Sequence, residues 1–277
     1  MGRVTARKRV TRVRRGEAAV TRPDTLAVEE PLEIRVTGQP YTVTMRTPGH
    51  DVELAAGLLV SEGVLRRTAD LITARYCAGA TEGGVNTYNI LDVTIAEDVE
   101  PPRPRARLTT SACGVCGKDS IDAVSVPPAF SAASDPLVVD AATVLDLPDR
   151  LRAAQTVFDR TGGLHAAALY DPAADEILVV REDVGRHNAV DKVIGWAVLH
   201  DRLPLCGTVL QVSGRAGFEL VQKAAAAGVP MLSAVSAPSS LAVELAVAQG
   251  ITLAGFVRGQ SMVLYSRADR VRPEVAS

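Results

Sequence analysis

The sequence has 277 residues, of which 47% are hydrophobic and 22% charged, so it can bury the core of one large or two smaller domains. Four cysteines are too few for a disulfide scaffold, and aromatic residues make up only 4% of the chain, which argues against a base-stacking surface for nucleic acid. The net charge of −2 hides seven basic side chains and no acidic one in residues 1–16. The acidic remainder excludes a nucleic-acid-binding domain by its bulk charge.

The basic N-terminal arm, residues 1–20, is expected to be a disordered tail, although its arginine-rich, acid-poor composition also fits a transit peptide. Acidic residues interrupt the sequence that follows it, so it is not a secretory signal. No stretch approaches 18 apolar residues, and no membrane span is expected. We therefore expect a cytoplasmic protein with reduced thiols.

A smaller, strand-rich α+β subdomain is predicted over residues 21–106. Strands are expected at 26–36, 41–46 and 86–96, and a helix at 52–60. A stiff, proline-rich stretch at 100–105 ends this subdomain. A second proline-rich region lies at 127–136, so residues 107–139 form a linker that contains a pair of cysteines.

An α/β layered domain is predicted over residues 140–277. Short apolar strands at 177–181, 208–212, 229–235 and 251–257 alternate with helices at 187–199, 215–227 and 239–248. The strands are continuous apolar runs, which is typical of a mostly parallel sheet covered on both faces.

Small and ionisable residues follow each of these strands. Arg186 and His187 follow the first, Ser213, Gly214 and Arg215 the second, and Arg258 the last. Parallel strands bring such loops to one edge of the sheet, where helix N-termini and arginines favour a phosphate-bearing ligand. The alternative is that these are ordinary turns with solvated arginines.

Two histidines near these loops have two interpretations each. His187 is a ligand contact or a helix-capping residue, and His165 faces the site or is packed in the core. Asp191 and Lys192 are expected to form a surface pair on the helix that begins near His187.

The strongest local motif is the pair Cys113 and Cys116 in the sequence CGVCG. Structural zinc, dithiol redox chemistry, a sulfur-carrying thiolate and two inert buried thiols are all open. Zinc-deaminase chemistry is not expected, because no histidine is followed by x-Glu and Ala112 replaces the proline of that motif. No structural metal is expected, since Cys77 and Cys206 lie far apart in the sequence.

Several motifs together resemble the FdhD family of formate dehydrogenase accessory sulfurtransferases. The resemblance spans residues 25–267 in collinear order and rests on SEG at 61–63, CGVCG at 113–117, GGLHAAA at 162–168, EDVGRH at 182–187 and SGR at 213–215. It does not cover the basic arm.

The resemblance implies a cytidine-deaminase-like fold without zinc, and a sulfurtransferase function. Such a protein takes sulfur from a cysteine desulfurase and passes it to bis-molybdopterin guanine dinucleotide before that cofactor enters formate dehydrogenase. It implies that Cys113 carries the persulfide, that Cys116 is its partner thiol, and that the cofactor binds at Phe256, Val257, Arg258, Gly259, Gln260 and Ser261. Other members can carry Lys-Pro-Gly-Arg in this stretch, whereas this chain has the single Arg258.

The full predicted cofactor site adds the loop and helix residues to that stretch, namely Ser213, Gly214, Arg215, Arg186, His187 and Lys223. The alternative function is a non-catalytic cofactor-binding chaperone whose cysteines are redox or metal ligands. A homodimer is the expected oligomer.

Overall fold

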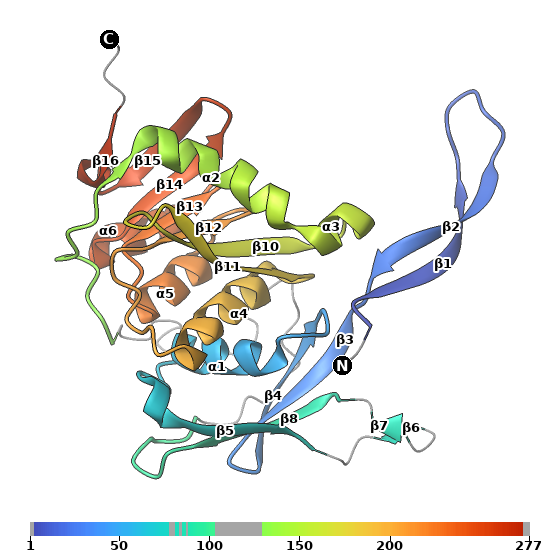
Figure 1. Cartoon of the computed structure of the whole chain (residues 1–277), viewed down its shortest axis with the longest axis horizontal. Helices are drawn as coiled ribbons and strands as arrows, with labels where there is room; N and C mark the ends of the chain where they lie inside the picture. Colours follow the sequence, from blue (N-terminus) through green and yellow to red (C-terminus); the bar gives the residue numbers. More distant parts are fainter. Residues whose placement is uncertain (1–2, 78–80, 83–84, 87, 103–128, 274–277) are drawn as a thin grey trace.

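The computed structural model describes residues 3–77, 81–82, 85–86, 88–102 and 129–273. Cys113 and Cys116 lie outside these described residues. The described chain is a mixed α/β structure in which a six-stranded sheet and a four-stranded sheet are joined through helices (Figure 1). No helix in the described part of the chain is long and apolar enough to cross a membrane.

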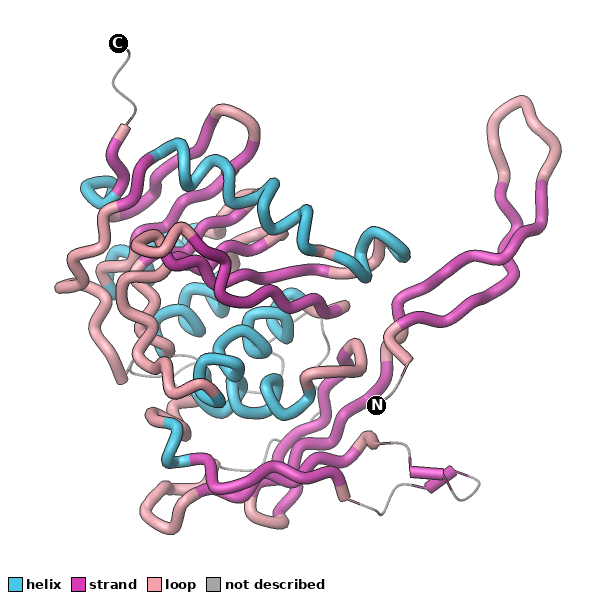
Figure 2. Tube along the Cα trace, in the orientation of Figure 1, coloured by secondary structure: helices cyan, strands magenta, loops and turns pink. Residues whose placement is uncertain are grey.

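The N-terminal arm forms a β-hairpin, so the expectation of disorder is wrong for most of it. Strand β1 (Thr5–Arg12) pairs antiparallel with β2 (Val20–Ala27), and Gly16 adopts a positive φ of 80° in the connecting turn. Both strands contain several β-branched valines and threonines, which favour extended backbone. The many basic residues between these valines and threonines made the segment resemble a disordered tail in the sequence. The hairpin projects away from the rest of the molecule (Figures 1 and 2).

The first half of the chain folds around a four-stranded sheet of order β4-β3-β8-β5, covered on one face by helix α1. Its elements are β3 (Glu30–Val36), β4 (Gln39–Arg46), α1 (Asp51–Ser61), a 3-10 turn at Thr68–Asp70, β5 (Leu71–Tyr76), the short pair β6 (Thr81–Glu82) and β7 (Val85–Asn86), and β8 (Ile90–Ile95). The predicted strands and helix are confirmed, while β5 was not predicted. Alternate residues of β3 and β8 are buried.

The second half forms a six-stranded sheet of order β11-β10-β12-β13-β14-β15. Its strands are β10 (His165–Asp171), β11 (Glu176–Asp183), β12 (Val209–Val212), β13 (Met231–Ala234), β14 (Thr252–Arg258) and β15 (Ser261–Ser266). The helices are α2 (Ala141–Ala154), α3 (Thr156–Thr161), α4 (Arg186–Leu199), α5 (Phe218–Ala226) and α6 (Ser240–Gln249). A 3-10 turn at Ala268–Arg270 precedes β16 (Val271–Arg272), which pairs with β9 (Val139–Asp140).

The prediction of a mostly parallel sheet is wrong. Among the described strands of this sheet, only the pairs β12–β13 and β13–β14 are parallel, and the other three pairings are antiparallel. Two strands account for this: β10, whose antiparallel direction has no signal in its alanine-rich sequence, and β15, which was not predicted and pairs antiparallel with β14. Because β10 is antiparallel to both neighbours, β11 and β12 still run in the same direction. The carboxyl ends of β11 to β14 therefore meet at one edge, as predicted.

Helices cover both faces of this sheet. Helix α2 packs through Val144 and Leu147 on one face, and α4 and α5 cover the other (Figure 1). The buried cluster on the second face also includes Leu32 and Leu91 from the four-stranded sheet. Both halves of the chain therefore share one hydrophobic core.

The two halves meet where α1 crosses α4 at backbone contact. A Cβ atom on Gly57 of α1 would lie 1.8 Å from the carbonyl oxygen of Asp191, and one on Gly195 of α4 would lie 1.7 Å from the carbonyl oxygen of Glu53. Only glycine permits this approach, because the atoms that would clash belong to the backbone and cannot rotate away. Each helix therefore has a glycine where it contacts the backbone of the other helix.

Gly57→Ala and Gly195→Ala are therefore each expected to destabilise the protein by about 3 kcal/mol, because the added methyl group forces the helices apart. The free energy of unfolding in denaturant measures this loss. Gly163→Ala is the control, since the nearest atom to its Cβ would be 3.9 Å away. Equal stabilities of the three variants would contradict the close crossing.

Candidate functional site

One edge of the six-stranded sheet collects most of the residues predicted for the site. The loops after β11, β12, β13 and β14 lie there, and α4, α5 and α6 begin from the first three of them. Ser239 caps α6 by accepting a hydrogen bond from the backbone of Ala242, whereas the described helices α4 and α5 begin after Gly185 and Gly217 without a side-chain cap. The first turns of these two helices, where backbone N–H groups favour an anion, therefore lie at this edge.

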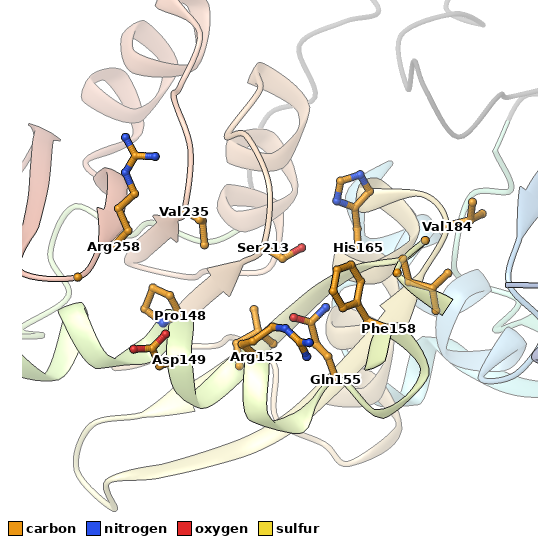
Figure 3. A pocket seen from close by; sticks show the side chains of 15 residues that line it. Pro148, Asp149, Arg152, Gln155, Phe158, His165, Val184, Ser213, Val235 and Arg258 are labelled. Atoms are coloured by element: carbon orange, nitrogen blue, oxygen red, sulfur yellow. The ribbon is translucent and has the colours of Figure 1, made fainter. Parts of the chain in front are cut away.

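A pocket of about 630 Å³ opens at this edge, between the sheet and helices α2 and α3 (Figure 3). Three predicted residues, Ser213, Arg258 and Gly259, line it together with His165. The remaining lining comes from Val184 and Val235 at strand ends, and from Pro148, Asp149, Leu151, Arg152, Gln155, Phe158, Gly162, Gly163 and Leu164. Helices α2 and α3 thus supply a wall that sequence reasoning missed.

The pocket combines apolar walls with cationic groups. The Arg152 guanidinium lies over the Phe158 ring at 4.7 Å from its centroid and also pairs with Asp159 at 2.6 Å. Arg258 is exposed at the other end, where its guanidinium lies 5.8 Å from the centroid of Phe256 (Figure 3). Planar guanidinium groups bind phosphate in a bidentate manner. The pocket can therefore accommodate a ligand with an apolar or planar part and an anionic part.

The pocket wall is tied to the strand ends by local hydrogen bonds. The Ser213 hydroxyl accepts a bond from the backbone N–H of Ala166 at 2.9 Å, which joins the loop after β12 to β10. The Glu182 carboxylate accepts bonds from the backbone N–H groups of Val157 and Phe158 at 2.9 and 2.7 Å. The end of β11 thereby holds the first turn of α3 beside the pocket.

The other residues of the predicted stretch 256–261 have different surroundings. Val257 is fully buried in the core beneath α2, so it packs rather than faces a ligand. Phe256 is partly buried with a positive φ of 53°, and Gln260 and Ser261 are exposed in the turn to β15. Arg215 is exposed and Gly214 lies beside the His165 ring, but neither lines the pocket.

His165 lies at the boundary between the two faces of the sheet edge. It lines the pocket, and it also interacts electrostatically with Arg186 and His187 at the start of α4. Burial, and then the charges of Arg186 and His187, lower the pKa of its imidazole below the ordinary value. His165 is therefore a neutral donor or acceptor at neutral pH. The structure thus favours the site over the core for this residue.

His187 is buried at the start of α4 and binds a protein group. Its Nε2 atom lies 2.5 Å from the carboxylate of Glu219 on α5. Its Nδ1 atom and the Nε atom of Arg186 are buried and have no hydrogen-bond partner among the residues that the structure describes. His187 joins the first turns of α4 and α5, and it does not line the pocket.

One prediction about charged residues is corrected by buried ion pairs. Asp191 and Lys192 do not form a surface pair, because both are buried and each binds a different partner. Lys192 lies 2.7 Å from Asp183, and Asp191 lies 2.7 Å from Lys223 and accepts a bond from Ser61 at 2.8 Å. Burial raises the pKa of Asp191 despite the attraction of Lys223. Lys223 is therefore held by Asp191, and its role as a phosphate ligand stays a prediction.

Lys223→Met is expected to lower the free energy of unfolding by about 3–5 kcal/mol, because it leaves the Asp191 carboxylate buried without its cation. Adding Asp191→Asn in the same chain should restore part of the loss. Arg75→Met, at an exposed position outside the N-terminal hairpin, serves as the control. A Lys223→Met protein as stable as this control would contradict the buried pair.

Comparison with known proteins places these features in a family. The FdhD/NarQ family model matches residues 27–272. The sulfur carrier protein FdhD of Mycolicibacterium paratuberculosis is 59% identical over 271 residues, which cover 97% of this chain and 99% of that protein. The sulfur carrier protein FdhD of Streptomyces coelicolor is 59% identical over 275 residues, covering 98% of this chain and 97% of that protein.

A solved structure has the same fold. It is a crystal structure from Desulfotalea psychrophila, described as a formate dehydrogenase accessory protein, and it matches with a TM-score of 0.79 over 98% of this chain and 100% of that chain. At 21% sequence identity, this match is evidence for the fold alone. The cytidine-deaminase-like layering stays a prediction.

Proposed function

This chain belongs to the FdhD/NarQ family, and from that premise we propose that it is a sulfurtransferase that matures formate dehydrogenase. It takes sulfane sulfur from a cysteine desulfurase and delivers it to bis-molybdopterin guanine dinucleotide. The relatives named sulfur carrier protein FdhD support the first step, since they match over nearly the whole chain. The observation that carries the second step is the pocket at the carboxyl edge of the sheet.

Sulfur is carried on Cys113. The Cys113 thiolate attacks the outer sulfur of a persulfide on the donor, a new S–S bond forms at Cys113, and the donor leaves as a thiolate. The exchange is redox-neutral and requires an accessible thiolate. Each cysteine is followed by a glycine, Gly114 or Gly117, whose lack of a side chain favours access to the thiol. Lys118 comes next, and a nearby cation favours the thiolate form. Cys116 is the partner thiol.

The cofactor is cargo, and the pocket holds its guanine dinucleotide part. The guanidinium groups of Arg258 and Arg152 lie where they can bind the phosphates, and Phe158 and Leu151 offer apolar contact. Gly259 has a positive φ of 56° with open space around it, so a ligand can approach the backbone closely there. The exposed Arg215 and the first turn of α4 lie on the other face of the same edge. Formate dehydrogenase receives the loaded cofactor, and the protein acts in the cytoplasm.

The persulfide is tested by intact mass. Incubation with a cysteine desulfurase and cysteine should add one sulfur atom to the chain, and Cys113→Ser should abolish the adduct. Cys206→Ser is the matched control, because Cys206 is an exposed thiol elsewhere in the fold. If the wild-type protein gains no sulfur and still binds the cofactor, the chain is a cofactor-binding chaperone instead.

The pocket is tested by nucleotide affinity with GDP as the probe. Arg258→Ala should weaken GDP binding by about 1.5–3 kcal/mol, the value of a hydrogen bond to a charged group, as measured by calorimetry. Arg75→Ala, at an exposed position in the four-stranded sheet, should leave the affinity unchanged. Equal affinities of these two variants would remove Arg258 from the site.

A further inference from the structure

We propose that the basic β-hairpin of residues 3–27 is a docking arm that binds the acidic body of a second copy of this chain. This inference goes beyond the proposed function and does not depend on it. It begins from the position of the hairpin, which forms a two-stranded sheet of its own and projects from the molecule (Figures 1 and 2).

The hairpin lacks a hydrophobic core. None of the residues in β1 or β2 is buried, and Val20 and Leu26 have 57% and 41% of their surface exposed. The hairpin is closed at its base by a hydrogen bond from the N–H of Val28 to the carbonyl of Val4 at 3.0 Å, and Arg160 of α3 donates one to the Thr5 hydroxyl at 3.5 Å. An isolated two-stranded hairpin is marginally stable in water. A partner surface would supply the missing contacts.

The charges of the arm and the body are complementary. Residues 3–27 hold eight basic and two acidic side chains, which leaves 22 basic and 30 acidic side chains in the rest of the chain. The only ion pair formed within described residues 3–27 joins Arg14 to Glu17 at 3.7 Å, near the tip. An arm of net charge +6 is therefore attracted to a body of net charge −8 on another molecule. A second copy of this chain has such a body, and it is present wherever the protein is.

The two faces of the arm favour a protein partner over a nucleic acid. The pairing register places Arg7 and Arg9 on one face, opposite Thr25 and Pro23. The other face alternates cations with apolar residues, and its members are Ala6, Lys8, Val10, Arg12, Val20, Arg22, Asp24 and Leu26. Exposed apolar side chains among cations match a protein surface, whereas the acidic body would repel a polyanion.

Side chains, rather than added strands, would make the contacts. Pro23 has no N–H group and interrupts β2, which disfavours strand addition along that edge. Each strand has eight residues, so the arm extends about 27 Å at roughly 3.4 Å per residue. A compact chain of this size has a radius of gyration of about 19 Å. The arm can therefore lie across the surface of a neighbour, and two copies can exchange arms about a two-fold axis.

The test is sedimentation velocity of the full chain over a micromolar concentration series at low and high salt. We expect a dimer that weakens at high salt, and a double variant Arg7→Glu/Arg9→Glu whose dissociation constant rises about tenfold. The control Arg66→Glu/Arg75→Glu changes the net charge equally at exposed positions outside the arm and should dissociate as the wild type does.

Hydrogen exchange on the same samples provides a second readout. The amides of residues 5–27 should become more protected as the concentration rises in the wild type, but not in the Arg7→Glu/Arg9→Glu variant. A monomer at all concentrations, or a dimer equally strong in both double variants, would overturn the proposal. Arm-dependent binding of a DNA duplex without self-association would also overturn it.

Discussion

The backbone contact between α1 and α4 is the constraint on which the rest of the structure depends. Gly57 and Gly195 let the two helices approach closely enough for Ser61 of α1 to reach Asp191 of α4. Asp191 in turn holds Lys223 of α5, and the adjacent Lys192 holds Asp183 at the end of β11. Buried charges of this kind are stable only when each has its partner in place. The crossing thereby fixes the start of α4, where Arg186 and His187 lie at the sheet edge.

That edge has two chemically different faces. On the α2 face, an open pocket is lined by apolar side chains, Arg152 and Arg258. On the α4 and α5 face, His187 is paired with Glu219 and Lys223 with Asp191, so these charges already bind protein groups. His165 lies between the two faces and is held neutral by burial and by neighbouring positive charge. The antiparallel strand β10 brings His165 to the same edge as the carboxyl ends of its neighbours.

The local pattern of the sequence predicts the secondary-structure elements better than it predicts which side chains bind one another. Strands β12, β13 and β14 are apolar runs bounded by turn residues, and their convergence on one edge is confirmed. The antiparallel direction of β10 was missed because it depends on pairing with β11 and β12, for which its short alanine-rich sequence has no signal. The partner of Lys223 lies 32 residues away, and that of Ser61 lies 130 residues away, so neither pairing has a local signal. The sequence of α2 and α3, which form one wall of the pocket, has only the pattern of an amphipathic helix and no motif that indicates a binding site.

In the proposed function, the pocket on the α2 face of the sheet edge receives the phosphate-bearing part of the cofactor. Hydrogen–deuterium exchange of the full chain with and without GDP tests it most directly. Binding in the pocket predicts added protection in residues 148–165 and 256–261, which contain most of its lining. Protection confined to the first turns of α4 and α5, or no protection at either segment, would contradict the account.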